Sequence, residues 1–285
     1  MTRSGAQLSQ LPTHTATRYV QALREGGSLP AVVETHDGGL FVVKFRGAGQ
    51  GVKALIAELI VGTLARSAGL PTPELSLIDV PDSFGRSEPD PEIQDLLRAS
   101  HGTNVGVRYL DGAFNFDGNA AAGCISRELA SRLVWFDAFV ANPDRTHRNP
   151  NLMVWKREPY LIDHGSALYV QHDWPSVDEA RTRSPFELSR HHVLLSKAED
   201  IAAADAELSK MLTPDVITDA VASVPDELLT EPAIKADFTT PAAARKRYAD
   251  YLVMRISAPR AFAGEAIAAN ARARRMPPQR VSSRR

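Results

Sequence analysis

A loop over residues 142–149 holds the side chains best suited to chemistry. Asp144 and Asn149 stand five positions apart within it, between an apolar segment and a short predicted strand. Asp163 follows at the end of the next apolar run, where a glycine turn frees its carboxylate. Carboxylate and amide oxygens are ligands that Mg²⁺ prefers, and a further carboxylate can orient or deprotonate a hydroxyl. These residue types fit phosphoryl transfer, which needs positioned groups and neutralised charge more than covalent chemistry.

A cation for the phosphates is available earlier in the chain. Lys44 lies in an otherwise apolar predicted strand, 40–45, where an ammonium group is costly to bury unless it meets an anion. We expect it to contact the α- and β-phosphates of a nucleotide; the alternative is an edge lysine that reaches to water. Glu58, flanked by apolar residues in the predicted helix 53–68, is expected to pair with Lys44. A surface glutamate is the alternative.

The loop residues have structural alternatives too. The segment 142–149 could be a plain polar turn, and Asp163 could cap the turn that follows it. The order of the four roles along the chain favours the catalytic interpretation. Arg145, His147 or Arg148 could neutralise transferred charge or brace the loop, and the sequence does not rank them.

Two glycine-containing loops could contact a nucleotide. Gly26, Gly27 and Ser28 lie between the first two predicted strands, where backbone N–H groups and the hydroxyl could hold phosphates; a plain hairpin loop is the alternative. The glycines of segment 47–51 lack the spacing of a dinucleotide fingerprint and follow a hairpin rather than a βαβ unit. That segment is left as a possible lid.

The elements that must position these residues change in character along the chain. The first part predicts mainly strands and the second part mainly helices. Predicted strands cover 19–23, 31–35, 40–45, 75–80 and 105–110, with helices at 53–68 and 91–99. Later helices are predicted over 125–141, 199–212, 214–222, 241–256 and 259–275, with short strands at 152–155 and 160–163. This order favours an α+β fold over alternating βαβ units.

The expected architecture is therefore bilobed, with a small, mostly antiparallel sheet and one major helix in the first lobe and a mainly helical second lobe. We divide the chain into a flexible N-terminus (1–17), a nucleotide-binding lobe (18–110), a helical lobe with the catalytic loop (111–271) and a basic disordered tail (272–285). A cleft between unlike lobes is a typical ligand site.

The composition excludes several classes of protein. The net charge of -1 gives no general reason to expect nucleic acid or a membrane surface as partner, and no stretch is apolar enough to span a bilayer. Cys124 is the single cysteine, so no intrachain disulfide can form and a cytoplasmic location is expected. The histidines, including the pair His191 and His192, lack the spacing of a zinc site and are interpreted as solvated or core residues.

Four segments together resemble the HipA-like branch of the protein-kinase-like superfamily, whose lipid-kinase relatives also use an Asp-Arg catalytic loop. They are the VVKF strand, the helix with Glu58, the DRTHRN loop and the LIDHG turn, and the resemblance extends from Arg18 to about Val170. It implies ATP and Mg²⁺ as cofactors, with Lys44 as the nucleotide lysine, Asp144 as the catalytic aspartate, and Asn149 and Asp163 as metal ligands.

The resemblance also implies a kinase whose acceptor is a hydroxyl group, by default Ser or Thr of a protein. ATP is expected between the two lobes, and the strand 105–110 is expected to lead to the hinge, with Tyr109 and Leu110 at the nucleotide. Two alternatives share this site: a nucleotide-binding pseudokinase or scaffold without transfer, and a small-molecule phosphotransferase.

Two departures from the resemblance bear on these alternatives. Toxins of this branch carry an additional N-terminal region, whereas this chain starts almost directly with the small lobe. Its first loop, REGGSLP, also differs from their usual nucleotide loop. A toxin role therefore stays open, as does dependence on an antitoxin.

Overall fold

The computed structural model describes most of the chain, namely residues 11–23, 29–86, 88–117 and 123–275. The predicted phosphate-binding residues Gly26, Gly27 and Ser28 lie outside the described residues. The first ten and last ten residues lie outside them too, and these stretches hold most of the predicted flexible N-terminus and disordered tail.

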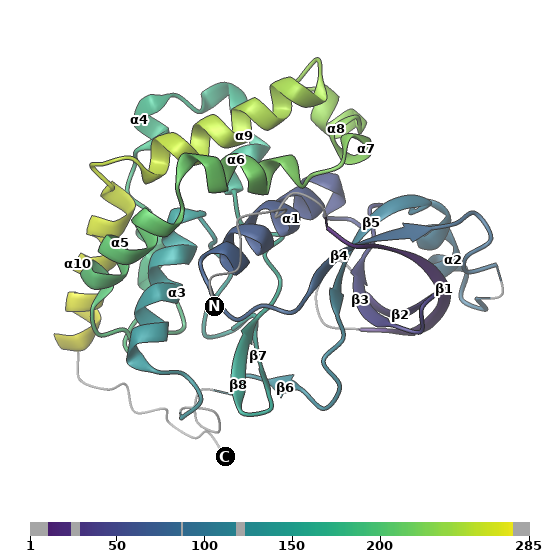
Figure 1. Ribbon diagram of the computed structural model, residues 1–285, viewed down its shortest axis with the longest axis horizontal. Helices are drawn as coiled ribbons and strands as arrows, with labels where there is room; N and C mark the ends of the chain where they lie inside the picture. The colour runs from purple at the N-terminus through teal and green to yellow at the C-terminus, as the bar shows by residue number, and fades with distance from the viewer. Residues whose placement is uncertain (1–10, 24–28, 87, 118–122, 276–285) are drawn as a thin grey trace, which may run out of the picture.

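Five strands of the first part close into a barrel in the order β1-β2-β3-β5-β4 (Figure 1). They are β1 (Thr13–Ala22), β2 (Ala31–Thr35), β3 (Leu40–Lys44), β4 (Leu75–Val80) and β5 (Gly102–Arg108). Neighbours are antiparallel except β1 and β4, which pair in parallel. The predicted small, mostly antiparallel sheet is thus a closed barrel, in which the pairing of β1 with β4 makes the closure.

The parallel pair depends on a strand longer than the sequence predicted. β1 begins at Thr13, not at Tyr19, and its first three residues pair with Leu77, Ile78 and Asp79 of β4. Only Ala16 of its ten residues is buried, so no apolar alternation marked the strand. The boundary placed between residues 17 and 18 falls inside it.

A hairpin and a helix place the first site residues. β2 and β3 are joined by a tight turn in which Gly38 has a φ of +77°, as the His-Asp-Gly-Gly sequence predicted. Helix α1 (Gly51–Ser67) is buried along almost its whole length, which is typical of a helix enclosed by other elements. It lies between the barrel and the later helices (Figure 1). α2 (Pro91–Arg98) begins with a proline that directly follows the N-cap residue Asp90.

The second part is mainly helical, as predicted. Its helices are α3 (Arg127–Phe139), α4 (Glu179–Thr182), α5 (Ile201–Met211), α6 (Pro214–Ala222), α7 (Asp226–Leu229), α8 (Pro232–Lys235), α9 (Pro241–Ile256) and α10 (Ala261–Arg275). Short 3₁₀ turns cover Tyr169–His172, Trp174–Ser176 and Glu187–His191. A small antiparallel sheet contains β6 (Phe114–Asn115), β7 (Leu152–Trp155) and β8 (Glu158–Leu161).

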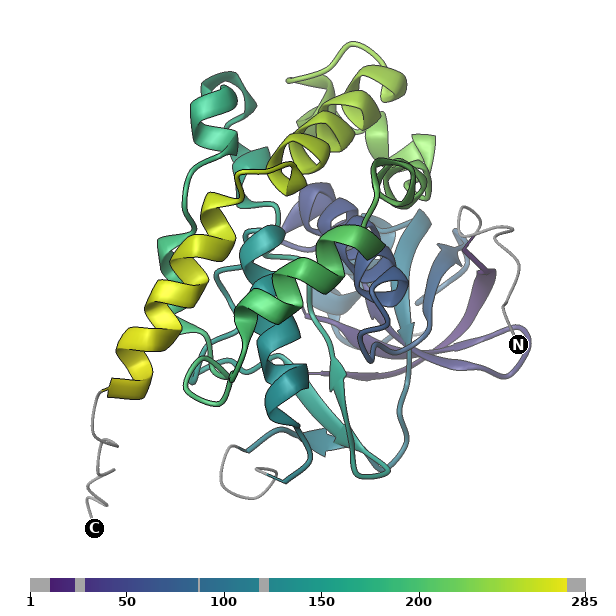
Figure 2. The ribbon, with the colours of Figure 1, turned by 60° about the vertical axis from the view of Figure 1, so that its left-hand side comes forward.

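Helix α3 leads directly into the predicted catalytic loop, and its packing is extensive. It contacts α5 and α10, which run beside it (Figure 2). The ring of Trp135 stacks on Phe139 and meets the ring of Phe262 from α10 edge to face. The aromatic residues of this helix are therefore core residues, and they fix the point at which the loop begins.

Helix α10 extends to Arg275, as predicted for the last helix, so the start of the basic tail placed at residue 272 falls inside it. Arg272, Arg274 and Arg275 form the last turn of α10, and Arg274 donates to the carbonyl oxygen of Glu199 at 3.2 Å. Cations at a helix C-terminus are favoured by the helix dipole, so this correction has a simple cause. Within the part of the chain that the structure describes, no helix is both long and apolar enough to cross a membrane.

Candidate active site

Lys44 stands at the point where the barrel, α1 and the second part of the chain meet. Its Nζ atom lies 2.5 Å from Glu58 Oε2 and 2.5 Å from Asp163 Oδ1. The Lys44 side chain is 13% exposed and that of Glu58 only 2%, so the alternatives of an edge lysine and a surface glutamate are wrong. The structure brings together three predicted site residues that are widely separated in the sequence.

Charge explains why these groups can be buried together. Burial by itself would lower the pKa of Lys44, but the carboxylates of Glu58 and Asp163 outweigh it and raise that pKa above its ordinary value. Burial likewise opposes the charge of Asp163, yet the Lys44 ammonium holds the pKa of Asp163 below its usual range. The lysine is therefore protonated and Asp163 is ionised, which is the state that phosphate and metal binding would use.

The turn that carries Asp163 is anchored to α1. Glu58 Oε2 accepts a hydrogen bond from the backbone N–H of His164 at 2.8 Å, in addition to its contact with Lys44. Asp163 adopts a left-handed backbone conformation with a φ of +56°, and its Oδ1 accepts a long hydrogen bond from the N–H of Gly165. One buried glutamate thus fixes both the lysine and the neighbour of the predicted metal ligand.

Asp144 is held from one side by amides. Its Oδ2 accepts from Asn149 Nδ2 at 2.9 Å and from Asn151 Nδ2 at 3.1 Å, and the hydroxyl of Ser166 lies 3.5 Å from the same oxygen. The predicted pair Asp144 and Asn149 is thus in direct contact. Asn151 and Ser166 were missed in the sequence, because a buried asparagine before a strand carries no signal of its own.

A buried brace lies beneath this loop. Arg145 is fully buried, and its Nε donates to Asp137 Oδ2 at 2.6 Å while its Nη1 donates to the carbonyl oxygen of Asn151. His192 Nε2 lies 2.9 Å from the same oxygen of Asp137. Arg145 is therefore the loop cation that supports the loop, whereas His147 and Arg148 are exposed. Asp137 was missed because it is surrounded by apolar residues of α3.

The brace is an ion pair with a neutral histidine beside it. Burial opposes the charge of Asp137, but Arg145 and His192 together hold the pKa of Asp137 well below its usual range. Burial lowers the pKa of His192, with Arg145 adding to that effect against the opposing pull of Asp137. A carboxylate paired with a guanidinium and further hydrogen bonds is the arrangement that makes such a buried charge tolerable.

Tyr109 and Leu110 occupy the connection that leaves the barrel. The strand predicted over 105–110 ends at Arg108, and the N–H of Tyr109 still donates to the carbonyl oxygen of Leu40 at 2.9 Å. Leu110 is buried. The two residues therefore link the barrel to the second part, where the sequence placed the hinge.

The donor set suits Mg²⁺. Asp163 offers a carboxylate that is 36% exposed, and Asn149 is an exposed residue whose amide nitrogen already faces Asp144, which leaves its carbonyl oxygen for a ligand. Among the described residues there is no group of three or more His, Cys, Asp or Glu that could hold a metal ion. Mg²⁺ is usually bound through one or two protein oxygens and keeps water and phosphate oxygens in its shell.

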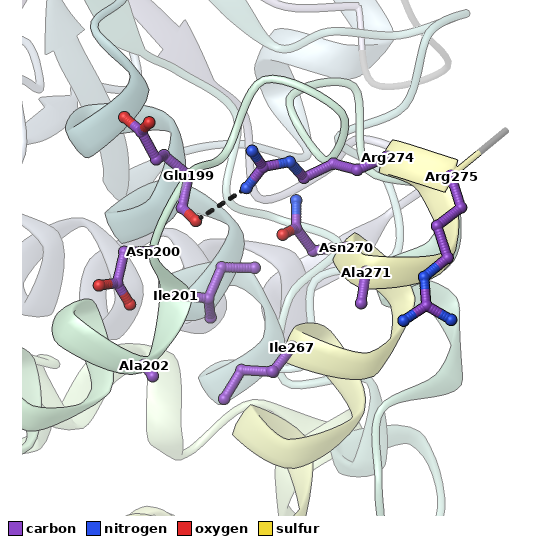
Figure 3. A pocket seen from close by; sticks show the side chains of 9 residues that line it. All are labelled: Glu199, Asp200, Ile201, Ala202, Ile267, Asn270, Ala271, Arg274 and Arg275. Carbon is purple, nitrogen blue, oxygen red and sulfur yellow. Dashed lines mark hydrogen bonds between the residues drawn. The ribbon is translucent and has the colours of Figure 1, made fainter. Parts of the chain in front are cut away.

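Two surface hollows lie away from these residues. One of about 320 Å³ opens between the start of α5 and the end of α10, with Ile201, Ile267 and Asn270 among its lining residues (Figure 3). The other lies beside Gly47–Gly49 and α2. Gly47 packs tightly there, since a Cβ atom would come within 2.7 Å of Ala99 Cβ. The first residue of the glycine segment suggested as a lid, Gly47, therefore packs against Ala99 at the C-terminal end of α2.

Comparisons with known proteins agree with this geometry. The model of the HipA-like kinase family matches residues 17–245. No curated protein matches the sequence. Among solved structures, the fold is similar to that of the proinflammatory kinase CtkA of Helicobacter pylori, with a TM-score of 0.53 and 13% sequence identity over 92% of this chain and 99% of that one. At this identity the likeness shows the fold alone, whereas the family match covers most of the chain. The chain therefore belongs to the HipA-like kinase family.

Proposed function

We propose that this protein is an ATP- and Mg²⁺-dependent kinase that transfers the γ-phosphate to a hydroxyl acceptor. The observation that carries the proposal is the double ion pair of Lys44 with Glu58 and Asp163. It joins a strand lysine, a helix glutamate and a turn aspartate in one partly open site, and each is a group that phosphoryl transfer requires. The family to which the chain belongs supports the same activity.

The residues divide the work by their chemistry. Lys44 would hold the α- and β-phosphates, with Glu58 fixing its position. Asp163 and Asn149 would hold Mg²⁺, which neutralises charge on the phosphates when it is bound. The hydrogen bonds that described residues donate to the Asp144 side chain end on Oδ2, so Oδ1 is the atom that would accept the proton of the attacking hydroxyl.

Other parts of the proposal come from the family likeness. Gly26, Gly27 and Ser28 would lie over the phosphates, and Tyr109 and Leu110 beside the base. The acceptor would be Ser or Thr of a protein, and ATP supply would place the reaction in the cytoplasm. Small alcohols are the alternative acceptors, because the same centre serves either class and only the acceptor pocket differs.

The test is transfer of labelled γ-phosphate from ATP·Mg²⁺ to protein and small-alcohol acceptors. Asp144→Ala should lower transfer by about 100- to 10,000-fold through loss of the general base. Asp163→Ala should abolish it through loss of the metal ligand. Asp250→Ala, which removes an exposed carboxylate from α9, is the matched control and should leave transfer unchanged. Full transfer by folded Asp144→Ala or Asp163→Ala would contradict the proposal.

A thermal-shift titration distinguishes the pseudokinase alternative. Because ligands that bind only the folded state stabilise it, ATP·Mg²⁺ should raise the Tm of the unaltered protein, and Lys44→Ala should reduce that rise. A rise in Tm without transfer to any acceptor would favour the nucleotide-binding scaffold.

A further inference from the structure

Asn151 is placed where it can control the catalytic carboxylate. It directly precedes β7, it is 8% exposed, and its φ of +46° lies in the left-handed region. Its Nδ2 lies 3.1 Å from Asp144 Oδ2. Asparagine is one of the few residues other than glycine that adopts this backbone conformation readily, so the position combines an unusual backbone with a directed amide.

The backbone of Asn151 is fixed from two directions. Its carbonyl oxygen accepts from the buried Nη1 of Arg145 and from the N–H of Ile162 at 3.1 Å. Arg145 is in turn tied to Asp137, and Ile162 immediately precedes Asp163. The backbone of Asn151 therefore contacts the buried brace through Arg145 and the approach to the proposed metal ligand Asp163 through Ile162.

The two amides that hold Asp144 differ in their surroundings. Asn149 is exposed, and its carbonyl oxygen is the one proposed for Mg²⁺. Asn151 is buried, its side-chain amide donates to Asp144, and its backbone carbonyl oxygen accepts from Arg145. A hydrogen bond from a donor whose backbone is fixed restricts the carboxylate more than one from an exposed side chain, because less motion remains to be lost on binding.

From this geometry we propose that Asn151 is a positioning residue that binds Asp144 Oδ2 and thereby turns Oδ1 toward the acceptor hydroxyl. The inference rests on the proposed kinase function and adds a residue that acts through Asp144. It requires that the amide hydrogen bond, rather than the bulk of the side chain, supports transfer.

Asn151→Gly is the sharpest test of this role. Glycine accepts a positive φ without strain, so the carbonyl contacts with Arg145 and Ile162 should persist while the amide is lost. Removal of one hydrogen bond to a charged group should lower kcat by about 10- to 100-fold. The rise in Tm caused by ATP·Mg²⁺ should not change, since Asn151 lies outside the proposed nucleotide contacts.

Asn151→Asp keeps the shape of the side chain but replaces the amide that donates to Asp144 by a carboxylate that can only accept. Its carboxylate would lie beside Asp144 Oδ2, and one of two adjacent carboxylates binds a proton more readily. The acid limb of the pH profile of kcat should therefore move to higher pH, in addition to a fall in kcat at neutral pH. A side chain that only fills space would give no such movement.

The matched control is Arg157→Gly, because Arg157 is exposed in the β7–β8 turn and has a φ of +69°. The assay measures transfer of labelled γ-phosphate to dephosphorylated casein and to water together, per mole of folded protein by circular dichroism. The control should retain the unaltered kcat. An unchanged kcat in Asn151→Gly, or an unmoved pH profile in Asn151→Asp, would overturn the inference.

The two proposals fail in different ways. If Asp144→Ala abolishes transfer while Asn151→Gly does not alter it, the kinase proposal stands and the role of Asn151 is wrong. If Asp144→Ala retains full transfer, the proposed function is itself contradicted.

Discussion

Two clusters of charged side chains support the proposed site, and they are built differently. In the first, Lys44 is shared by Glu58 and Asp163 where the barrel meets the later part of the chain, and Asp163 is 36% exposed. In the second, Arg145 and His192 share Asp137 entirely within the interior. The first cluster has an open side and the second has none.

This difference separates contacts that a substrate can replace from contacts that are permanent. A phosphate oxygen could take the place of Asp163 on Lys44, because the ammonium group can bind any nearby anion and the carboxylate is reachable from solvent. Nothing from solution can reach Asp137, whose side chain is 1% exposed. We therefore expect changes in the open cluster to alter activity and changes in the buried cluster to alter stability.

The largest expected effect follows removal of the central carboxylate of the buried cluster. Asp137→Ala leaves the Arg145 guanidinium buried without a counter-charge, which should lower the free energy of unfolding by about 3–5 kcal/mol. Urea unfolding followed by circular dichroism measures this change. Lys246→Ala, which breaks the exposed pair with Asp250 on α9, should change it by less than about 1 kcal/mol.

Equal effects of these two substitutions would show that the buried cluster adds no more to stability than an exposed ion pair. Such a result would require the loop to open on loss of Asp137, so that water could solvate the Arg145 guanidinium. Increased protease sensitivity of residues 142–150 would reveal such an opening.

A medium effect is expected in the open cluster. Glu58→Gln preserves the size of the side chain and removes its charge, while Asp163 continues to pair with Lys44. Lys44 then pairs only with Asp163, the carboxylate that is also proposed to hold the Mg²⁺ of the nucleotide. The KM for ATP should therefore rise by roughly tenfold, which corresponds to about 1.4 kcal/mol. Steady-state kinetics with varied ATP measure this, and a KM that does not rise would show that Glu58 has no part in positioning Lys44.

Local patterns made much of this site predictable. Lys44 in an apolar strand, and the carboxyl and amide groups of the loop and turn, are informative because each polar type breaks an apolar run at an element boundary. The pairing of Lys44 with Glu58 followed from the cost of burying either charge alone. Strands β2 to β5, β7 and β8 and the long helices followed from periodicity and from terminating glycine and proline residues, whereas β6 was not predicted.

The remaining features depend on contacts between distant segments. The barrel closes through parallel pairing of β1 with β4, and the mostly exposed β1 gave no apolar signal. Asp137 is an acidic residue in an apolar helix, and its partners come from the loop and from His192, which follows the 3₁₀ turn Glu187–His191. The role of Asn151 depends on a positive φ that the sequence does not display. Such features are set by tertiary structure, which overrides local propensity.

The smallest expected effect concerns the pH dependence of the buried cluster. Burial lowers the folded-state pKa of His192 below its ordinary value of 6.5, so the unfolded chain binds a proton at this residue while the folded protein does not. Stability should therefore fall as pH decreases below about 6.5 and approaches the lower, folded-state pKa, by at most about 1.4 kcal/mol per pH unit. His192→Gln keeps a donor for Asp137 and cannot titrate, so its urea-unfolding free energy should fall less steeply over the same range.

The groups that face His192 are Asp137, Arg145 and His147, and none of them is changed in this variant. Parallel pH profiles for the two proteins would mean that His192 is protonated in the folded state, and that the buried cluster contains two cations around one carboxylate.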